Sequence, residues 1–259
     1  MLVAVVGCSG NNNEEPVNPG ADDLPEQLQA IVNRGKLLVG TKVDVPGFGY
    51  QNPETGDVEG LEIDIAKALA KKLLGDETLL ETQGVTAQTR GPLLDNNEVD
   101  LVIATFTITE ERKLSFNFTE PYFTDAIGFL VKKDLGATVI EDLDGLTIGV
   151  AQSATTKDAL EERAAEVGVT FKYAEFASYP EINAALASGR VDAFSVDKSI
   201  LSGYVNETTV ILEEGFKPQD YGIACKLDNK DLAEYVQEFI VEIKADGTLD
   251  SMLAKWNLN

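Results

Sequence analysis

Hydrophobic and polar positions alternate along the chain in two different periods, one typical of helices and the other of strands. The segment "LEIDIAKALAKKLLG" (61–75) repeats its apolar residues every three or four positions and stops at a glycine, as an amphipathic helix does. The run "KLLVGTK" (36–42) is apolar until it ends at a glycine and a polar pair, as a buried strand does. Strands alternating with helices predict an α/β fold with mostly parallel sheets.

The same two periods divide the rest of the chain into elements. Helices are predicted over 24–35, 61–75, 90–97, 154–168, 179–189, 231–245 and 248–256. Strands are predicted over 36–42, near 78–82, over 99–106, in a long run that follows the bend at Pro121, and over 146–152, 170–176, 191–197 and 222–225.

Two pairs of segments repeat one plan. "LLDNNEVDLVIATF" and "ALASGRVDAFSVD" each pass from a helix end through a turn and a Val-Asp pair into an apolar strand. "GKLLVGTK" and "GLTIGVAQ" share a glycine, an apolar strand, a second glycine and a polar pair. The repetition predicts two α/β units of similar design, from about 36 to 123 and from about 127 to 218, although helix–turn–strand joints also resemble one another by chance.

Composition excludes several classes of function. The formal net charge of −23 argues against a nucleic-acid partner and against adhesion of the folded body to anionic lipid. The absence of histidine removes Ser-His-Asp and Cys-His catalytic groups and histidine-ligated metal sites. Since no D-x-D-x-D-G calcium loop occurs either, we expect neither a metal nor a cofactor.

The N-terminal stretch "MLVAVVGCSG" resembles the end of a bacterial lipoprotein signal. The letters "VVGC" match a lipobox, which predicts lipid attachment at Cys8, although the charged region expected at the start of a signal is missing. The polar residues that follow predict that 1–23 is a signal remnant and flexible tether. The body would then lie outside the cytoplasmic membrane, held only by the lipid. The alternative is a disordered start with an accidental cysteine.

Polar residues follow four of the predicted strands. Ligands of open α/β sheets bind beyond the carboxyl ends of strands, so these positions are the candidates for a site. They are Thr41-Lys42, Thr105–Thr109, Gln152–Thr156 and Ser195–Lys198.

Arg112 occupies an unusual position in "TFTITEERKLSF". We expect Thr109 to cap a helix there, so Arg112 falls in its first turn, where a cation is mildly disfavoured. A bound carboxylate would offset this, and the planar guanidinium suits one. Thr155 and Thr156 open another predicted helix, whose free N–H groups favour an anion.

Asp197 ends the apolar strand "VDAFSVD" and suits an ammonium group. A carboxylate site at Arg112, with the Thr107 hydroxyl beside it, and an ammonium site at Asp197 together describe a free α-amino acid. Other interpretations stay open, because Arg112 can instead pair with a surface acid, and Asp197 or Thr155 can act only as a helix N-cap.

Five ordered blocks of the sequence resemble the amino-acid-binding proteins of bacterial ABC importers. The blocks are "GKLLVGTKVDVPGFG", "GLEIDIAKALAKKL", "VDLVIATFTITEERKLSFNFTEPY", "IGVAQSATT" and "VDAFSVD". The resemblance covers about residues 24 to 259 and is strongest to members that bind aspartate or glutamate. It implies a type II clamshell of two lobes, each a mostly parallel sheet flanked by helices. Lobe 1 would comprise 24–123 plus 222–259 and lobe 2 would comprise 127–218, with hinge crossings at 123–126 and 219–221.

The resemblance also implies roles for the polar strand ends. It assigns the ligand backbone to Thr105 and Thr107, the α-carboxylate to Arg112 with Thr155 and Thr156, and the α-ammonium to Asp197.

Three further residues bear on the ligand side chain. Lys42 stands where glutamine-binding members tend to carry an acid, and Arg90 matches a position associated with acidic ligands, so together they would neutralise a side-chain carboxylate. The alternatives are a solvated lysine at the cleft rim and a surface arginine in a first turn. Tyr221, beside the second crossing, would close over the ligand or only pack.

The implied function is capture of aspartate or glutamate by closure of the cleft and delivery to a membrane ABC permease, by a monomer. The alternatives are a protein that binds glutamine or another polar amino acid, and an enzyme like cyclohexadienyl dehydratase on the same fold. Cys225, in the apolar segment "GIAC", is expected to be an inert core thiol.

Overall fold

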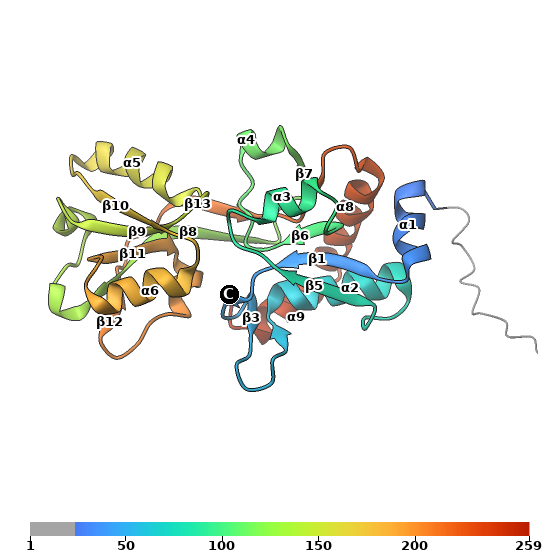
Figure 1. Cartoon of the computed structure of the whole chain (residues 1–259), viewed down its shortest axis with the longest axis horizontal. Coiled ribbons are helices and arrows are strands. Elements are labelled where there is room, and N and C mark those ends of the chain that lie inside the picture. Colours follow the sequence, from blue (N-terminus) through green and yellow to red (C-terminus); the bar gives the residue numbers. More distant parts are fainter. Residues whose placement is uncertain (1–23, 259) are drawn as a thin grey trace, which may run out of the picture.

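The computed structural model describes residues 24–258, which form two α/β lobes joined by crossing strands (Figure 1). The first lobe is built on a five-stranded sheet in the order β5-β1-β6-β14-β7 and the second on a six-stranded sheet in the order β10-β9-β11-β8-β12, with β13 paired to β8. The site lies where the lobes face each other.

The first lobe contains eight strands, β1 (Leu37–Thr41), β2 (Asp44–Val45), β3 (Gly49–Gln51), β4 (Val58–Glu59), β5 (Leu80–Gly84), β6 (Leu101–Ile103), β7 (Phe116–Phe118) and β14 (Ala224–Lys226), of which β2, β3 and β4 form a small separate sheet. Its helices are α1 (Glu26–Arg34), α2 (Leu61–Leu74), α3 (Arg90–Asp95), α4 (Glu110–Lys113), α8 (Lys230–Ala245) and α9 (Thr248–Lys255).

The second lobe contains β8 (Phe123–Lys132), β9 (Thr147–Ala151), β10 (Lys172–Phe176), β11 (Ala193–Asp197), β12 (Thr209–Ile211) and β13 (Phe216–Tyr221). Its helices are α5 (Thr156–Val167), α6 (Tyr179–Ser188) and α7 (Lys198–Ser202), with two 3₁₀ turns, η2 (Lys133–Leu135) and η3 (Ile140–Leu143). Helices α5 and α6 lie on opposite faces of the sheet (Figure 1).

The two lobes repeat one βαβαβ plan. In each, the first strand lies between the second and the third, so that β5-β1-β6 matches β10-β9-β11, and these pairs are parallel. The Val-Asp pairs also make matching contacts. Asp100 Oδ2 accepts from the Leu38 N–H at 2.8 Å, and Asp192 Oδ2 accepts from the Thr147 N–H at 2.8 Å. The repeated sequence plan is therefore a repeated structural unit.

The sheets are mixed, because antiparallel strands extend the parallel core of each. Strand β14 pairs antiparallel with β6 and β7, and β8 pairs antiparallel with β11, β12 and β13. The parallel direction predicted from alternating strands and helices thus holds for the repeated units, and the chain returning from the other lobe supplies the antiparallel strands.

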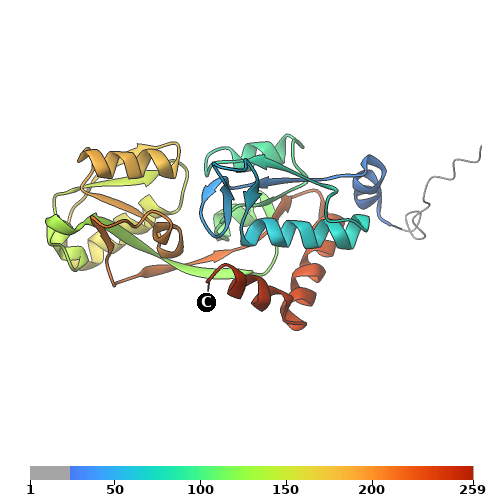
Figure 2. The same ribbon diagram turned by 90° about the horizontal axis from the view of Figure 1, so that it is seen from below.

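Strands β8 and β13 run side by side between the two sheets (Figure 2). Their pairing extends from Phe123 with Tyr221 to Ile127 with Phe216, so the predicted hinge crossings lie within one two-stranded ribbon. How far that ribbon bends, and the exact lobe boundaries, stay a prediction.

Side chains of the first lobe contact the ribbon and the second lobe. Phe48 of the first lobe packs edge-on against Phe123 and Tyr221 of the ribbon, with ring centroids 5.2 and 5.8 Å apart. The Tyr204 hydroxyl of the second lobe donates to the Asp44 carbonyl of the first at 2.5 Å. The main hydrophobic cluster accordingly contains residues from both lobes.

Most predicted elements are confirmed, and the differences are at their ends. Helix α1 ends at Gly35 and α2 at Gly75, both in the left-handed conformation that glycine allows. The strand expected near 78–82 lies at 80–84, and the strand expected over 99–106 is shorter, at 101–103. Backbone that leaves the sheet after residue 103 is what positions the site.

Two features bear on the relation of the protein to a membrane. The predicted lipid attachment at Cys8 and the predicted tether lie outside the described residues. Within the part that the structure describes, no helix has the length and apolar character needed to cross a bilayer.

We predict that Gly60→Ala strongly destabilises the fold. Gly60 precedes α2 at φ +136°, and an added Cβ would lie 2.0 Å from the Phe48 carbonyl oxygen. Steric clash with backbone adds to the strain of a positive φ, so we expect a loss of about 3 kcal/mol or more. Urea unfolding measures it. The control is Gly56→Ala, at φ +79° with open space around it, which should cost only about 1 kcal/mol. Equal losses would contradict the role of the clash.

Candidate functional site

The polar residues at the carboxyl ends of the strands meet between the two lobes. Lys42 follows β1 and Arg90 opens α3 in the first lobe, while Asp197 ends β11 in the second. The charges of Arg90 and Arg112 both lower the pKa of Asp197, so the three groups interact across the lobe junction. The strand-end rule of α/β sheets thus selected charged residues that the structure brings close together, and their role as a ligand site stays a prediction.

Lys42 is buried, with 2% of its surface exposed, so the interpretation as a solvated rim lysine is wrong. Its Nζ lies 2.9 Å from a carboxylate oxygen of Asp44 and 4.6 Å from the ring centroid of Tyr179. Burial lowers the pKa of Lys42, and the charge and hydrogen bond of Asp44 oppose that effect. The lysine charge already has a partner before any ligand binds.

Arg90 is also buried, with 3% exposed, so the interpretation as a surface residue is wrong too. Its Nη1 donates to the carbonyl oxygens of Ala104 and Thr105, at 2.8 and 3.1 Å, and its guanidinium lies 4.0 Å from the Phe106 ring centroid. Burial lowers its pKa, and the charges of neighbouring groups, Glu62 among them, oppose the shift.

Glu62 is an acidic residue of this cluster that the sequence analysis did not select. One carboxylate oxygen accepts hydrogen bonds from the Tyr122 hydroxyl, at 2.6 Å, and from the Thr105 N–H. The other oxygen, Oε2, is buried and has no hydrogen-bond partner among the described residues. Burial raises the pKa of Glu62 to about 7, although both hydrogen bonds oppose the shift.

Arg112 has its guanidinium at the junction of the lobes. Nη1 donates to the Thr107 carbonyl at 2.7 Å, and Nη2 donates to the Ser153 carbonyl of the second lobe at 3.3 Å. Burial lowers its pKa to about 9, and the charge of Arg90 adds to this. Within residues 24–258 no carboxylate forms an ion pair with Arg112, and the nearby Glu110 pairs with Lys113 instead, at 2.7 Å.

The helix that carries Arg112 is shorter than the sequence suggested. Thr109 caps α4 as expected, accepting from the Arg112 N–H at 3.1 Å. Since α4 has only four residues, Arg112 lies in its last turn as well as its first. The helix dipole therefore gives little support for a bound carboxylate at Arg112. The absence of an ion-pair partner for Arg112 in the described residues gives more.

Asp197 is the buried acid on the opposite lobe, with 5% exposed. It occupies the N-cap position of α7, but its side chain makes no capping hydrogen bond and accepts one from the Tyr221 hydroxyl instead. Burial raises the pKa of Asp197 to about 7, and no cation in the described chain forms an ion pair with it. Arg112 and Asp197 are thus opposite charges that interact without touching.

The predicted threonines surround these charges. The Thr155 hydroxyl donates to Gln219 Oε1 at 2.8 Å and does not cap α5, while Thr156 is buried at the first position of that helix. Thr105 has a strained backbone, at φ +44°, and its buried hydroxyl has no partner in the described part of the chain. An unpartnered hydroxyl at a strained position is frequent at ligand sites.

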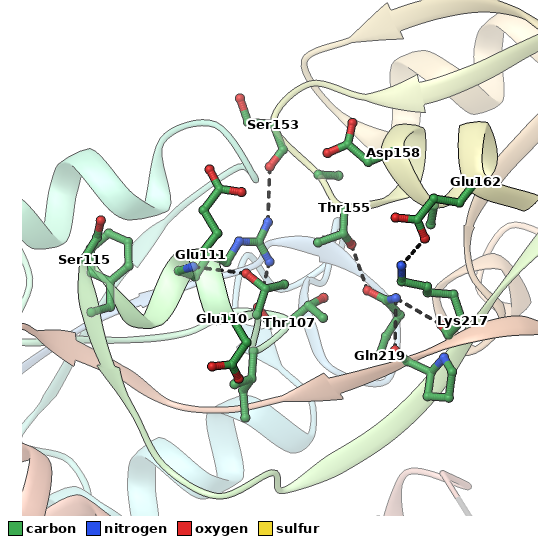
Figure 3. A pocket seen from close by; sticks show the side chains of 17 residues that line it. Thr107, Glu110, Glu111, Ser115, Ser153, Thr155, Asp158, Glu162, Lys217 and Gln219 are labelled. Carbon is green, nitrogen blue, oxygen red and sulfur yellow. Dashed lines mark hydrogen bonds and ion pairs between the residues drawn. The ribbon is translucent and has the colours of Figure 1, made fainter.

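A groove of about 750 Å³ opens beside the buried cluster (Figure 3). Thr107, Arg112 and Thr155 line it, together with Ser153 and Gln219. Figure 3 shows Thr155 facing Gln219, with the Ser153 carbonyl on the other side of the groove. The remaining predicted residues lie outside its lining, namely Lys42, Arg90, Thr105, Thr156, Asp197 and Tyr221. The groove gives solvent access to the carboxylate end of the predicted site.

Most of the charges at the junction have an opposite charge nearby. Three cations (Lys42, Arg90, Arg112) interact with Asp44, Glu62 and Asp197, and Asp125 is a fourth acid that acts on Asp197. Lys42 contacts Asp44, whereas Arg90 and Glu62 act on each other only through their charges. Arg112 and Asp197 likewise form no ion pair within residues 24–258, and they face each other from opposite lobes. A zwitterion fits these two, and no group of histidine, cysteine or acidic side chains within 24–258 is arranged to hold a metal ion.

Two residues of the cluster had a signal in the sequence that was not used. Glu62 lies three positions before Ile65 on the buried face of α2, so it is a charge within an apolar stripe. Tyr179 follows β10 and opens α6, which is another carboxyl end of a parallel strand. The ion pair between Lys42 and Asp44 had no such signal in the sequence. Two residues that are two positions apart do not reveal whether their side chains touch.

Comparison with known proteins agrees with this arrangement. Residues 37–259 match the model of the bacterial extracellular solute-binding proteins, family 3. The chain belongs to this family. It is therefore an extracytoplasmic amino-acid-binding protein of the kind that serves ABC importers, which confirms the family and the two-lobed fold expected from the sequence.

Similar proteins are named for amino acids. The chain is 40% identical to the glutamine-binding protein of Geobacillus stearothermophilus, over 88% of this chain and 89% of that one. It is 36% identical to the ABC transporter glutamine-binding protein GlnH of Bacillus subtilis, over 99% and 92%. Among solved structures, an ancestral arginine-binding protein bound to glutamine is 37% identical over 87% and 99%, with a TM-score of 0.78. All three are named as binding proteins, and an ancestral amino-acid-binding precursor of cyclohexadienyl dehydratase is also a structural neighbour, 31% identical with a TM-score of 0.79.

We predict that Asp197→Asn removes part of the pH dependence of stability in the ligand-free protein. The pKa of Asp197 is raised from 3.8 to about 7, so the folded state binds a proton more tightly than the unfolded chain. Its contribution to stability is complete below pH 4 and is lost as pH rises to about 7, by at most about 4 kcal/mol. Urea unfolding between pH 4 and 8 should show a smaller loss in the variant.

The matched control is Asp158→Asn, which changes an acid that lines the groove. Its pH profile should match that of the wild type. If Asp197→Asn also leaves the pH profile unchanged, the prediction is wrong, and burial of Asp197 does not raise its pKa in the folded protein.

Proposed function

We propose that this protein captures a free α-amino acid with a polar side chain, best L-glutamine, between its lobes and delivers it to an ABC permease. The observation that carries the proposal is the pair formed by Arg112 and Asp197. Asp197 is buried and Arg112 is half-buried, they come from opposite lobes, and neither has an ion-pair partner in the described chain. An α-amino acid supplies both countercharges at a fixed separation.

Each end of the ligand backbone has a matching group. The α-carboxylate would bind the guanidinium of Arg112, with the N-terminus of α5 at Thr155 and Thr156 supplying N–H groups. The α-ammonium would bind Asp197, whose second carboxylate oxygen is not used by Tyr221. Since removal of charges from water costs several kcal/mol unless each is paired, the closed state is stabilised by the ligand.

The side-chain end favours an amide over an acid. The sequence analysis assigned Lys42 and Arg90 to neutralise a ligand carboxylate. In the structure Lys42 is paired with Asp44, and Arg90 interacts with Glu62. With these acids ionised, no cation is left over for an additional negative charge, whereas a neutral amide adds no charge to the cluster. The two relatives named for glutamine support the same ligand.

Glutamate and aspartate are the second candidates, and one observation favours them. The pKa of Glu62 is raised to about 7, so this acid can take up a proton near neutral pH. Protonated Glu62 would leave Arg90 with a free positive charge for an acidic side chain. The expectation drawn from the sequence therefore stays testable.

Four further expectations drawn from the sequence stay proposals of the same kind. The lipid anchor at Cys8 lies outside the described residues. Bending at 123–126 and 219–221 would open the cleft, and docking on the permease as a monomer would complete delivery. Tyr221, which donates to Asp197 and packs against Phe48, would hold the acid in position for the ammonium.

We predict that calorimetry at pH 7.5 ranks six L-amino acids in the order glutamine first, glutamate and aspartate weaker, and asparagine weaker than glutamine. Arginine should bind hardly at all, because its cationic side chain lacks a free countercharge beside Lys42 and Arg90. Histidine should bind hardly at all for the same reason when its ring is protonated. Stronger binding of glutamate than of glutamine at this pH would contradict the balanced-charge argument and restore the acidic preference.

We predict that Arg112→Met lowers affinity for the ranked ligand by at least about a hundredfold, since the buried α-carboxylate loses its charged partner. The control is Arg190→Met, which removes an exposed guanidinium from the second lobe. It should leave affinity unchanged. Retained binding in Arg112→Met, with the fold verified by its unfolding transition, would show that Arg112 does not hold the carboxylate.

A further inference from the structure

Glu62 occupies a place that a purely structural residue does not need. It is the second residue of α2, is fully buried, and belongs to a helix whose buried face is otherwise apolar. One of its oxygens is held by Tyr122 and Thr105, and the other has no partner among residues 24–258. A buried carboxylate oxygen without a partner is costly, so it is a candidate for a group that changes its protonation when a ligand arrives.

Charged and titratable groups face Glu62 from several elements. Lys42 follows β1 and Arg90 opens α3, and both favour the ionised carboxylate. Tyr122, which precedes β8, donates its hydroxyl, and Tyr179 of α6 faces the same charges from the other lobe. Lys42 also pairs with Asp44, and the charges of both Lys42 and Arg90 lower the pKa of Glu62, Lys42 by the larger amount.

We propose that Glu62 is a specificity-determining residue whose protonation state decides whether the side-chain end of the cleft accepts an amide or a carboxylate. The proposal rests on the function proposed above. With L-glutamine bound, Glu62 stays ionised, because the amide adds no charge to the cluster. With L-glutamate bound, the extra negative charge is balanced by one proton, which Glu62 takes from solvent on its unpartnered oxygen.

The titration of Asp197 affects the binding of both ligands equally, so it does not change the difference in protonation between them. The pKa of Asp197 is also raised to about 7, and an α-ammonium would return Asp197 to its ionised form. That change is common to every α-amino acid. The difference in protonation between L-glutamate and L-glutamine binding therefore reports on the side-chain end alone.

The test is titration calorimetry of L-glutamine and L-glutamate from pH 6 to 8.5, in buffers of different ionisation enthalpy. Protons bound per ligand follow from the dependence on the buffer. At pH 8 we expect L-glutamate to take up close to one proton more than L-glutamine. We also expect the affinity for L-glutamate, relative to L-glutamine, to fall about tenfold for each pH unit above about pH 7.

Glu62→Gln should abolish both effects. The variant cannot titrate, so the two ligands should take up equal numbers of protons. Their affinity ratio should be independent of pH, with L-glutamate gaining at least about tenfold on L-glutamine at pH 8. The matched control is Glu59→Gln, an exposed acid three positions earlier, which should keep the wild-type proton difference.

Tyr122→Phe gives a second readout if Glu62→Gln does not fold. Loss of the hydroxyl removes a hydrogen bond that holds the ionised form, so the fall in relative L-glutamate affinity should begin at higher pH. Equal proton uptake for the two ligands in the wild type, or failure of L-glutamate to bind at any pH, would overturn the role of Glu62 and leave amino-acid binding intact. Failure of both ligands to bind would overturn the proposed function with it.

Discussion

The structure depends on the requirement that charges buried between two lobes be paired. Moving an ion out of water costs several kcal/mol, and only a countercharge with hydrogen bonds offsets that cost. Lys42 meets this requirement with Asp44, and Arg90 is compensated by backbone carbonyls and by Glu62. Arg112 and Asp197 meet it only in part. In the proposed function, closure around a zwitterion would remove the deficit, so ligand binding and closure would become one event.

The fold supports this requirement by bringing strand ends together. Two βαβαβ units with the same strand order each place polar residues after their central strands, and the β8–β13 ribbon sets the two edges face to face (Figure 1). Arg112 therefore comes from the segment after β6 and Asp197 from the end of β11, which are equivalent places in the two units. The repeated design explains how one ligand can meet complementary charges from both lobes.

The sequence predicted the fold well, for identifiable reasons, and it selected the charged residues that meet between the lobes. Gly35 and Gly75 ended helices as expected, and the two Val-Asp pairs marked equivalent strands that receive equivalent hydrogen bonds. Glycine conformation and strand periodicity are local properties, so one sequence reveals them. The strand-end rule then located Arg112 and Asp197 without knowledge of distances.

The partners of the site residues were not predictable in the same way. Lys42 was expected to be free for a ligand acid, and its burial against Asp44 and Tyr179 depends on how the two lobes pack. The proposed preference for glutamine follows from these partners and not from the residues alone. Sequence reasoning therefore led to amino-acid binding, and it proposed the side-chain specificity from an incomplete set of charges.

The most direct measurement is a crystal structure of the protein with L-glutamine bound. The account predicts the α-carboxylate on the guanidinium of Arg112 and the N-terminus of α5, and the α-ammonium within hydrogen-bond distance of Asp197. The side-chain amide should lie toward Lys42 and Arg90. A ligand that contacts neither Arg112 nor Asp197, or an ion pair between these two residues in the complex, would contradict the account.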